Sequence, residues 1–260
     1  MQDLTIALIQ ADLIWEDHKA NLTRFESFID RVPNDVQLIV LPEMFSTGFS
    51  MQADRLAQTM DGSAVVWMVE RAQATGADIA GSLIIKENAS YYNRLIWAKP
   101  DGTLAVYDKR HLFRYAGEEK IYTSGKRQLL VNCHGWNIRP FICYDLRFPI
   151  WTRNINNTYD AAIFVANWPE RRAPHWNALL KARAIENQCY VAGVNRVGVD
   201  GNGLCYQGDT SLIDPMGRSV ATMRHNETIV TGVLSASVLA DYRHSFPAWM
   251  DADGEMAVWK

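Results

Sequence analysis

Short apolar runs recur along this chain, between stretches in which apolar residues return every three or four positions. Runs of this length are typical of strands buried on both faces, whereas the wider spacing is typical of helices that bury one face. The helical pattern covers residues 21–32, 63–74 and 175–187. Strands are predicted at residues 4–10, 36–41, 79–85, 94–98, 103–107, 136–143, 161–166, 189–194, 210–213, 219–222 and 229–234.

The order of these elements predicts the fold class. Strands and helices alternate early in the chain, whereas turn signals such as Lys99–Gly102 and Asp214–Gly217 join neighbouring strands later. This mixture predicts an α/β protein with helices layered over sheets that contain both parallel and antiparallel strands. No linker rich in proline, glycine or serine and no repeat interrupts the pattern, so we interpret residues 1–260 as one domain.

Composition narrows the class of protein. The chain has 260 residues, 48% of them hydrophobic, and a formal net charge of −3. So mild a charge argues against a nucleic-acid partner, and no apolar run approaches the ~20 residues of a membrane helix. Residues 1–4 carry neither a basic segment nor an apolar signal core, and we therefore expect a cytoplasmic protein.

The cysteines are expected to be free thiols. They form no C-x-x-C pair and have no zinc-ligand spacing, so we expect neither disulfides nor a metal site. Cys143 differs from Cys133, Cys189 and Cys205 because it ends an apolar strand and opens a polar turn that Pro149 closes. Such a turn exposes a nucleophile and directs backbone N–H groups at the atom it attacks. For an isolated thiol, the alternative is a buried and inert cysteine.

Glu43 and Lys109 occupy comparable positions. Glu43 follows the strand predicted at 36–41, and Lys109 follows the strand predicted at 103–107. Because α/β sheets place their sites at strand ends, the two side chains could converge with Cys143. The glutamate could accept the thiol proton, while the lysine could stabilise a thiolate and the oxyanion on a substrate carbonyl. A glutamate after a strand is also typical of a charge at a helix N-terminus, and Lys109 could be one member of a solvated charged run. Spacing alone does not decide between these interpretations.

Three blocks of sequence favour the functional reading. They are residues 41–45 (Leu-Pro-Glu-Met-Phe), 107–113 (Tyr-Asp-Lys-Arg-His-Leu-Phe) and 143–149 (Cys-Tyr-Asp-Leu-Arg-Phe-Pro). In this order they resemble the signature blocks of the nitrilase superfamily of carbon–nitrogen hydrolases, and the similarity extends from the first strand to residues 246–249. Within that superfamily the chain is most similar to bacterial omega-amidases, through residues 165–169, 182–188 and 195–198.

The resemblance implies a fold and a reaction. The fold is a four-layer α-β-β-α sandwich with two mixed sheets, usually extended by helix packing into a homodimer. The reaction needs no cofactor: a low-pKa thiolate of Cys143 forms a thioester with the amide carbon, Lys109 binds the oxyanion, and Glu43 acts as the base. The implied substrates are terminal amides of 2-oxo dicarboxylic acids, such as 2-oxoglutaramate. These small molecules arise when glutamine donates its amino group, including in the last step of methionine salvage.

The family also has a second glutamate between the lysine and cysteine blocks, where this chain offers Glu118 and Glu119. Related amidases carry that glutamate seven residues before a glycine, and Gly125 is the matching glycine, which favours Glu118. Ser124 stands where relatives often have proline, so a shift of one residue keeps Glu119 open. The implied role is to hold Lys109 and to help position substrate or water.

Aromatic side chains near these blocks are candidates for the substrate pocket. Phe45, Tyr144 and Trp168 could line it, although aromatic residues at a sheet edge more often belong to the core. The backbone N–H of Tyr144 directly follows the nucleophile, which suits a donor to the oxyanion.

A substrate carboxylate would need a cation. Arg147 could bind it in a bidentate way, or could pair with Asp145 or Asp108 as part of the scaffold, which we favour. The other candidates lie between a predicted strand and a helix, and are Arg171, Arg172 and His175.

Other functions fit the same three residues. A nitrilase, an N-carbamoyl amide hydrolase or a general aliphatic amidase would use Glu43, Lys109 and Cys143 in the same way. A non-catalytic member that binds a small acid or a partner protein is a further alternative, and the presence of all three residues argues against it.

Overall fold

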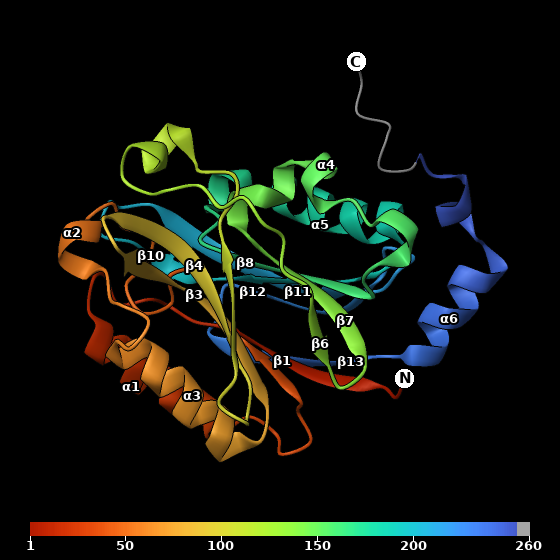
Figure 1. Ribbon diagram of the computed structural model, residues 1–260, viewed down its shortest axis with the longest axis horizontal. Coiled ribbons are helices and arrows are strands. Elements are labelled where there is room, and N and C mark those ends of the chain that lie inside the picture. Colours follow the sequence, from red (N-terminus) through yellow and green to blue (C-terminus); the bar gives the residue numbers. More distant parts are fainter. Residues whose placement is uncertain (254–260) are drawn as a thin grey trace.

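The computed structural model describes residues 1–253, whose strands form two mixed sheets packed face to face (Figure 1). In the first sheet the strand order is β13-β1-β2-β3-β4-β5, with β1, β2 and β3 mutually parallel. Its strands are β1 (Leu4–Gln10), β2 (Leu38–Val40), β3 (Asp78–Glu87), β4 (Ser90–Ala98), β5 (Leu104–Asp108) and β13 (Thr228–Leu234).

The second sheet has the order β10-β11-β9-β8-β7-β6, with β12 paired to β11. Its centre is parallel, because β7, β8 and β9 run in one direction. Its strands are β6 (Val131–Cys133), β7 (Trp136–Ile142), β8 (Ala161–Ala166), β9 (Tyr190–Asn195), β10 (Val197–Val199), β11 (Cys205–Ile213) and β12 (Ser219–Arg224).

Helices cover the outer faces of both sheets, which confirms the predicted four-layer α-β-β-α sandwich (Figure 1). On the first sheet lie α1 (His18–Ile29) and α3 (Ser63–Thr75), and on the second lies α5 (Ala173–Asn187). The remaining helices are α2 (Ala53–Leu56), α4 (Pro149–Thr152) and α6 (Ala236–Ser245). No helix within residues 1–253 combines the length and the apolar character that a membrane crossing requires.

Burial on both faces explains why the strands read as continuous apolar runs. In β1, Ile6 and Leu8 point into the core between the sheets, whereas Ala7 and Ile9 point towards α1 and α3. Such strands are the easiest elements to predict. Accordingly, β1, β7 and β8 begin and end within one residue of their predicted bounds.

Several elements differ from the sequence prediction. Helix α1 begins at His18 rather than at residue 21, because the Asp17 side chain accepts a hydrogen bond from the N–H of Ala20 (3.0 Å) and caps the helix there. The strands β6 and β10 have only three residues each, and the sequence pattern did not indicate them. Helix α6 was also missed, because it buries only Leu239 and so lacks a clear apolar stripe.

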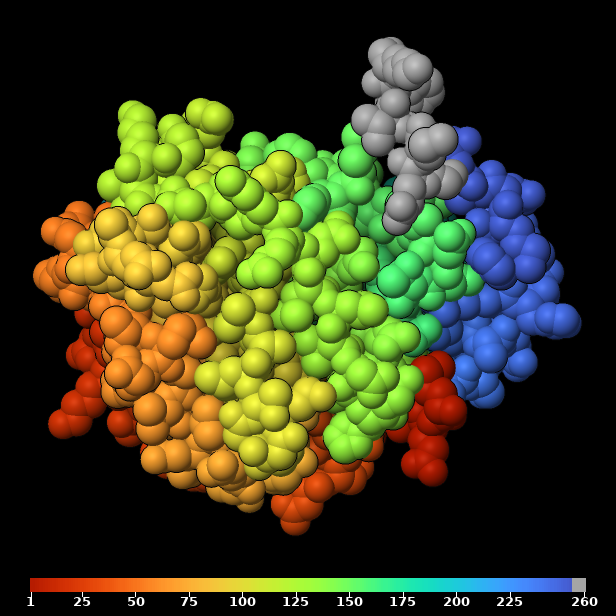
Figure 2. All heavy atoms as spheres, in the orientation of Figure 1, coloured from red at the N-terminus to blue at the C-terminus, as the bar shows by residue number. Residues whose placement is uncertain are grey.

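The strand directions bring the predicted reactive residues together at one end of the sandwich, where the strands that carry them terminate. Strand β5 runs in the same direction as β2, because two antiparallel pairings separate it from β3. The carboxyl ends of β2 and β5 therefore lie at the same edge of the first sheet. The carboxyl ends of β7 and β8 meet them from the second sheet, since Asn167 after β8 hydrogen-bonds to Glu43 after β2. Part of the segment 110–125 projects from the surface, at residues 114–116, whereas Glu118 and Tyr122 in the same segment are buried (Figure 2).

Candidate active site

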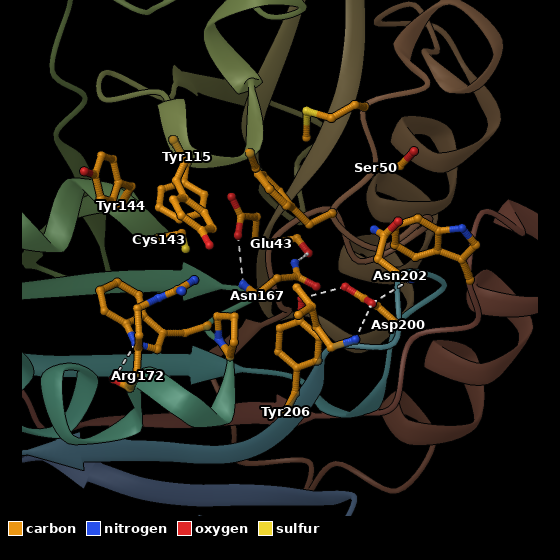
Figure 3. Close-up of a pocket in the computed structure, with 18 of the residues that line it drawn as sticks. Glu43, Ser50, Tyr115, Cys143, Tyr144, Asn167, Arg172, Asp200, Asn202 and Tyr206 are labelled. Atoms are coloured by element: carbon orange, nitrogen blue, oxygen red, sulfur yellow. Dashed lines mark hydrogen bonds between the residues drawn. The ribbon is translucent and has the colours of Figure 1, made fainter.

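Glu43, Lys109 and Cys143 each follow the strand that was predicted to carry them, namely β2, β5 and β7. Cys143 opens a 3-10 helix, Cys143–Arg147, with a backbone φ of 44°, and Met44 after the glutamate has a φ of 45°. This left-handed conformation costs a non-glycine residue about 1–3 kcal/mol and persists only where the surroundings fix it. Both turns thus change the chain direction sharply, which lets Glu43 and Cys143 face one cavity (Figure 3).

Lys109 lies between two carboxylates. Its Nζ donates to Oε1 of Glu43 at 2.8 Å and to the carboxylate of Glu118 at 3.0 Å. All three side chains are almost fully buried, with exposed fractions of 0–1%. An ammonium has three N–H donors, so one remains for a further oxygen acceptor in the cavity.

Neutral donors satisfy the remaining carboxylate oxygens. The Nδ2 of Asn93 donates to Oε1 of Glu43 (2.8 Å) and to Oε1 of Glu118 (3.3 Å). The backbone N–H of Asn167 donates to Oε2 of Glu43 (2.8 Å), and that of Phe113 donates to Oε2 of Glu118 (2.6 Å). Burying these charges is therefore compensated by hydrogen bonds from three different segments of the chain.

Of the two candidate glutamates, Glu118 contacts Lys109. Glu119 points away and lines a second cavity, where its Oε2 is buried without a hydrogen-bond partner in the described part of the chain. The spacing to Gly125 favoured Glu118 over Glu119, and the contact between Glu118 and Lys109 agrees with it. The N–H of that glycine donates to the carbonyl of Lys109 (2.9 Å), which fixes the loop at this point.

The electrostatics of this group are dominated by burial and by the two carboxylates. Burial alone would lower the pKa of Lys109, but the charges of Glu118 and Glu43 outweigh it and raise the pKa well above its ordinary value. Burial likewise raises the pKa of Glu118, against the opposing charge of Lys109. The lysine is therefore a permanent cation at neutral pH.

The thiol does not match the expected low-pKa thiolate. Burial, followed by the negative charge of Glu43, raises the pKa of Cys143 well above its ordinary value, and the charge of Lys109 does not compensate. The reason is the local charge balance, in which one ammonium faces two glutamates. The direction of this shift favours a thiol over a preformed thiolate, and the Glu43 carboxylate lies beside it.

A cavity of about 780 Å³ opens over the partly exposed Cys143. Its interior end is formed by Glu43, Lys109 and Asn167, and aromatic side chains form much of its wall (Figure 3). These aromatic residues are Trp15, Phe49, Phe113, Tyr115, Tyr144, Trp168 and Tyr206.

Two of the three predicted aromatic residues line this cavity, and one does not. Tyr144 and Trp168 belong to the wall. Phe45 is instead fully buried in the core between the first sheet and its helices, where its ring lies 5.3 Å from that of Phe25. The positive φ of Met44 turns the chain between Glu43 and Phe45, so that only the glutamate faces the cavity.

Four arginines line the same cavity, and one of them, Arg55, forms an ion pair with Glu16. The other three are Arg147, Arg171 and Arg172. None of these three forms an ion pair with a carboxylate among residues 1–253. Each guanidinium instead lies over an aromatic ring, that of Trp168 (4.7 Å), Tyr115 (5.6 Å) and Phe113 (5.2 Å) respectively.

The predicted pairing of Arg147 with Asp145 or Asp108 is therefore wrong. Asp145 is occupied by other donors, and Asp108 pairs with Arg94 at 2.6 Å. Arg147 instead contacts Nδ1 of His175 (3.0 Å), and His175 itself does not line the cavity.

Sequence reasoning missed Asn93 and Asn167 as parts of the site. Asn167 follows a strand end, as the three predicted residues do, so its position was an available signal. Asn93 lies within β4, where nothing in the local pattern distinguishes it from an ordinary polar strand residue. Tyr206 and its acceptor Asp200 (2.8 Å) were also missed, because they reach the cavity from the distant β10–β11 hairpin.

One group of side chains outside this site has the composition of a metal site. Atoms of Asp78, Cys133 and His134 lie within 4.8 Å of one another, near the opposite ends of the strands. Asp78 already accepts a hydrogen bond from Nε1 of Trp97 (2.7 Å). Burial and the charge of Asp78 raise the pKa of the Cys133 thiol well above its ordinary value, which disfavours a thiolate ligand.

The chain is similar to known enzymes over its full length. It is 48% identical over 260 residues to the omega-amidase YafV of Escherichia coli K12, and the alignment covers all of both chains. It is 34% identical over 251 residues to the 2-oxoglutaramate amidase of Bacillus subtilis, covering 95% of this chain and 96% of that enzyme.

Solved structures show the same fold. A CN-hydrolase superfamily protein from Xanthomonas campestris, with an arsenic adduct in its active site, has a TM-score of 0.96 and 45% identity over 98% of both chains. The nitrilase superfamily member Nit3 of Saccharomyces cerevisiae has a TM-score of 0.87 and 26% identity over 95% of both chains. The carbon-nitrogen hydrolase family model matches residues 5–244. The chain thus belongs to the carbon–nitrogen hydrolases of the nitrilase superfamily, enzymes that hydrolyse C–N bonds.

Proposed function

We propose that this enzyme is an omega-amidase, which hydrolyses the terminal amide of 2-oxo dicarboxylic acid monoamides such as 2-oxoglutaramate to the acid and ammonia. The observation that carries this proposal is the group of three arginines without carboxylate partners, in the cavity that contains Cys143. Cations held in such a position favour a substrate with a carboxylate at its far end. The similarity to the omega-amidase YafV and to a 2-oxoglutaramate amidase supports the same substrate class.

The proposed reaction begins with the Cys143 thiol. Its sulfur adds to the amide carbon while Glu43 accepts the proton, so that a thiolate never accumulates. The oxygen of the tetrahedral intermediate binds the remaining N–H of Lys109 and the backbone N–H of Tyr144. Tyr144 lies in the first turn of a 3-10 helix, where N–H groups have no acceptor within the helix.

Collapse of this intermediate breaks the C–N bond. Glu43 returns the proton to the leaving nitrogen, which departs as ammonia, and a thioester on Cys143 remains. A water molecule then loses a proton to Glu43 and attacks the thioester carbon. The acid leaves when the C–S bond breaks, and the proton returns to sulfur. In this scheme Glu118 holds Lys109 in place.

The wider proposal includes a single domain, a homodimer and a cytoplasmic enzyme that acts in methionine salvage. Free thiols in all four cysteines suit a reducing compartment. Exposed apolar side chains on the helical layer of the second sheet, such as Ile150 in α4 and Ile185 in α5, suit contact with a second copy.

The first prediction concerns substrate class. A panel of 2-oxoglutaramate, an aliphatic nitrile, a ureido acid and a neutral aliphatic amide should show the highest kcat/KM for 2-oxoglutaramate, measured as ammonia release. Cys143→Ala should abolish turnover of every substrate, while Cys205→Ala, a control at an exposed cysteine, should not change it. A higher kcat/KM for another member of the panel would assign the enzyme to that class instead.

The second prediction concerns the thiol. Glu43→Gln removes the base, so kcat should fall about 10²–10⁴-fold. It also removes a negative charge next to Cys143, so the pKa of the thiol should fall and alkylation of Cys143 by iodoacetamide at pH 7 should become faster. Mass spectrometry of labelled protein measures that rate, with Glu119→Gln as the control. Slower alkylation together with lost turnover would contradict the charge balance proposed for this site.

The third prediction separates the two neighbouring glutamates. Glu118→Gln should reduce kcat much more than Glu119→Gln, because only Glu118 contacts Lys109. Removal of one partner from a buried ion pair costs about 3–5 kcal/mol, so Glu118→Gln should also lower the unfolding midpoint in urea. Equal effects of the two substitutions on kcat would remove Glu118 from the catalytic set.

The fourth prediction concerns the arginines. Replacing the arginine that binds the substrate carboxylate by Met should remove a charge-assisted hydrogen bond worth about 1.5–3 kcal/mol, which raises KM for 2-oxoglutaramate at least tenfold. KM for a neutral amide should hardly change. The variants are Arg147→Met, Arg171→Met and Arg172→Met, and Arg114→Met, in the second cavity, is the control. If no variant distinguishes the two substrates, a general aliphatic amidase becomes the better assignment.

A further inference from the structure

Asp145 is fully buried, and its carboxylate accepts four hydrogen bonds. Its Oδ2 accepts from the hydroxyl of Tyr107 (2.7 Å) and from the backbone N–H of Ile142 (3.1 Å). Its Oδ1 accepts from the backbone N–H and from Nδ1 of His111, at 2.9 and 2.8 Å. A carboxylate whose two oxygens together accept four hydrogen bonds is fixed in position.

The donors of these bonds flank the two groups that would carry the reaction. Tyr107 and His111 stand two residues before and two residues after Lys109. Ile142 directly precedes Cys143, and Asp145 follows it by two residues. A single buried carboxylate therefore connects the chain on both sides of the lysine with the turn that presents the thiol.

These two segments belong to different sheets. Lys109 follows β5 at the edge of the first sheet, whereas Cys143 follows β7 in the second. The strand ladders of one sheet cannot set distances to the other, so side-chain contacts across the gap must do so. The hydrogen bonds of Asp145 with Tyr107 and His111 form such a contact between the two sheets, next to Lys109 and Cys143.

The same carboxylate stabilises the strained turn. Cys143 has a φ of 44°, and the Asp145 carboxylate accepts the N–H of the residue just before it, as an acidic residue does in the first turn of a capped helix. The far end of the turn is held separately, because Arg183 donates two hydrogen bonds to the carbonyl of Leu146 (2.7 and 3.1 Å).

We propose that Asp145 is a positioning residue, which sets the ammonium of Lys109 against the sulfur of Cys143. Asp145 does not line the substrate cavity, and its effect is exerted through the four hydrogen bonds. This inference rests on the roles proposed for Lys109 and Cys143, but not on the identity of the amide.

The test replaces one carboxylate oxygen by an amide in Asp145→Asn. The side chain keeps its size, but the new NH₂ group faces donors, so one end of the link must open. A displacement of about 1 Å in a catalytic group costs up to 10²-fold in rate, so kcat should fall roughly 10–100-fold with KM nearly unchanged. The rate of Cys143 alkylation by iodoacetamide should change as well.

A matched control separates this effect from lost stability. Asp160 is a partly buried carboxylate with a side chain 14% exposed, which accepts from the backbone N–H of Asn137 (3.0 Å) and from Arg243 (2.8 Å) near the start of β8, at the opposite ends of the strands from the site. Asp160→Asn should lower Tm but leave kcat and the alkylation rate of the folded enzyme unchanged. If Asp145→Asn also lowers Tm alone, Asp145 is only structural and the inference is overturned.

Two milder variants keep the inference testable if Asp145→Asn does not fold. Tyr107→Phe removes one donor, and His111→Phe removes another while keeping a ring to stack on Phe148, which lies 3.8 Å away. Each should lower kcat several-fold at constant KM, and unchanged kcat and alkylation in both would overturn the inference. Turnover is measured on whichever amide the wild-type enzyme hydrolyses fastest, so a wrong omega-amidase assignment is detected separately.

Discussion

The burial of the Lys109 ammonium between Glu43 and Glu118 is the constraint on which the rest of the site depends. Two carboxylates and one ammonium, all removed from water, are tolerable only if every remaining oxygen receives a hydrogen bond. These bonds come from Asn93 and Asn167, among others, and therefore from β4 and from the end of β8. Satisfying these charges thus requires the carboxyl ends of strands from both sheets to lie together. It also requires the loop that contains Glu118 to pack against them.

The same charge balance determines how the nucleophile works. Cysteines with a low pKa usually lie beside an unopposed cation or at a helix N-terminus. Here the cation is already paired twice, and burial together with the charge of Glu43 raises the pKa of the Cys143 thiol. In the proposed reaction a base beside the thiol is therefore needed, and the Glu43 carboxylate would have that role.

Much of this arrangement could be predicted from the sequence, and the failures have physical causes. Strands buried on both faces and strand-end residues such as Glu43 leave clear patterns, and the three ordered blocks identified the family. Phe45 was wrongly assigned to the pocket because the positive φ of Met44 turns the Phe45 side chain into the core. That backbone conformation cannot be recognised from the hydrophobic pattern. Arg147 was misassigned because the donors that occupy Asp145 lie about 35 residues away along the chain. Contacts of that range depend on the assembled fold.

The distribution of charge across the cavity also gives the proposed reaction a direction. The interior near Cys143 carries net negative charge, whereas Arg147, Arg171 and Arg172 make another part of the wall positive. A monoamide fits this polarity, because its carboxylate meets the arginines while its neutral amide reaches the interior. Hydrolysis converts that amide into a second carboxylate next to Glu43, where like charges repel. The two buried glutamates that raise the pKa of the thiol would therefore also favour release of the product, and would discriminate against a dicarboxylic acid binding in place of the amide.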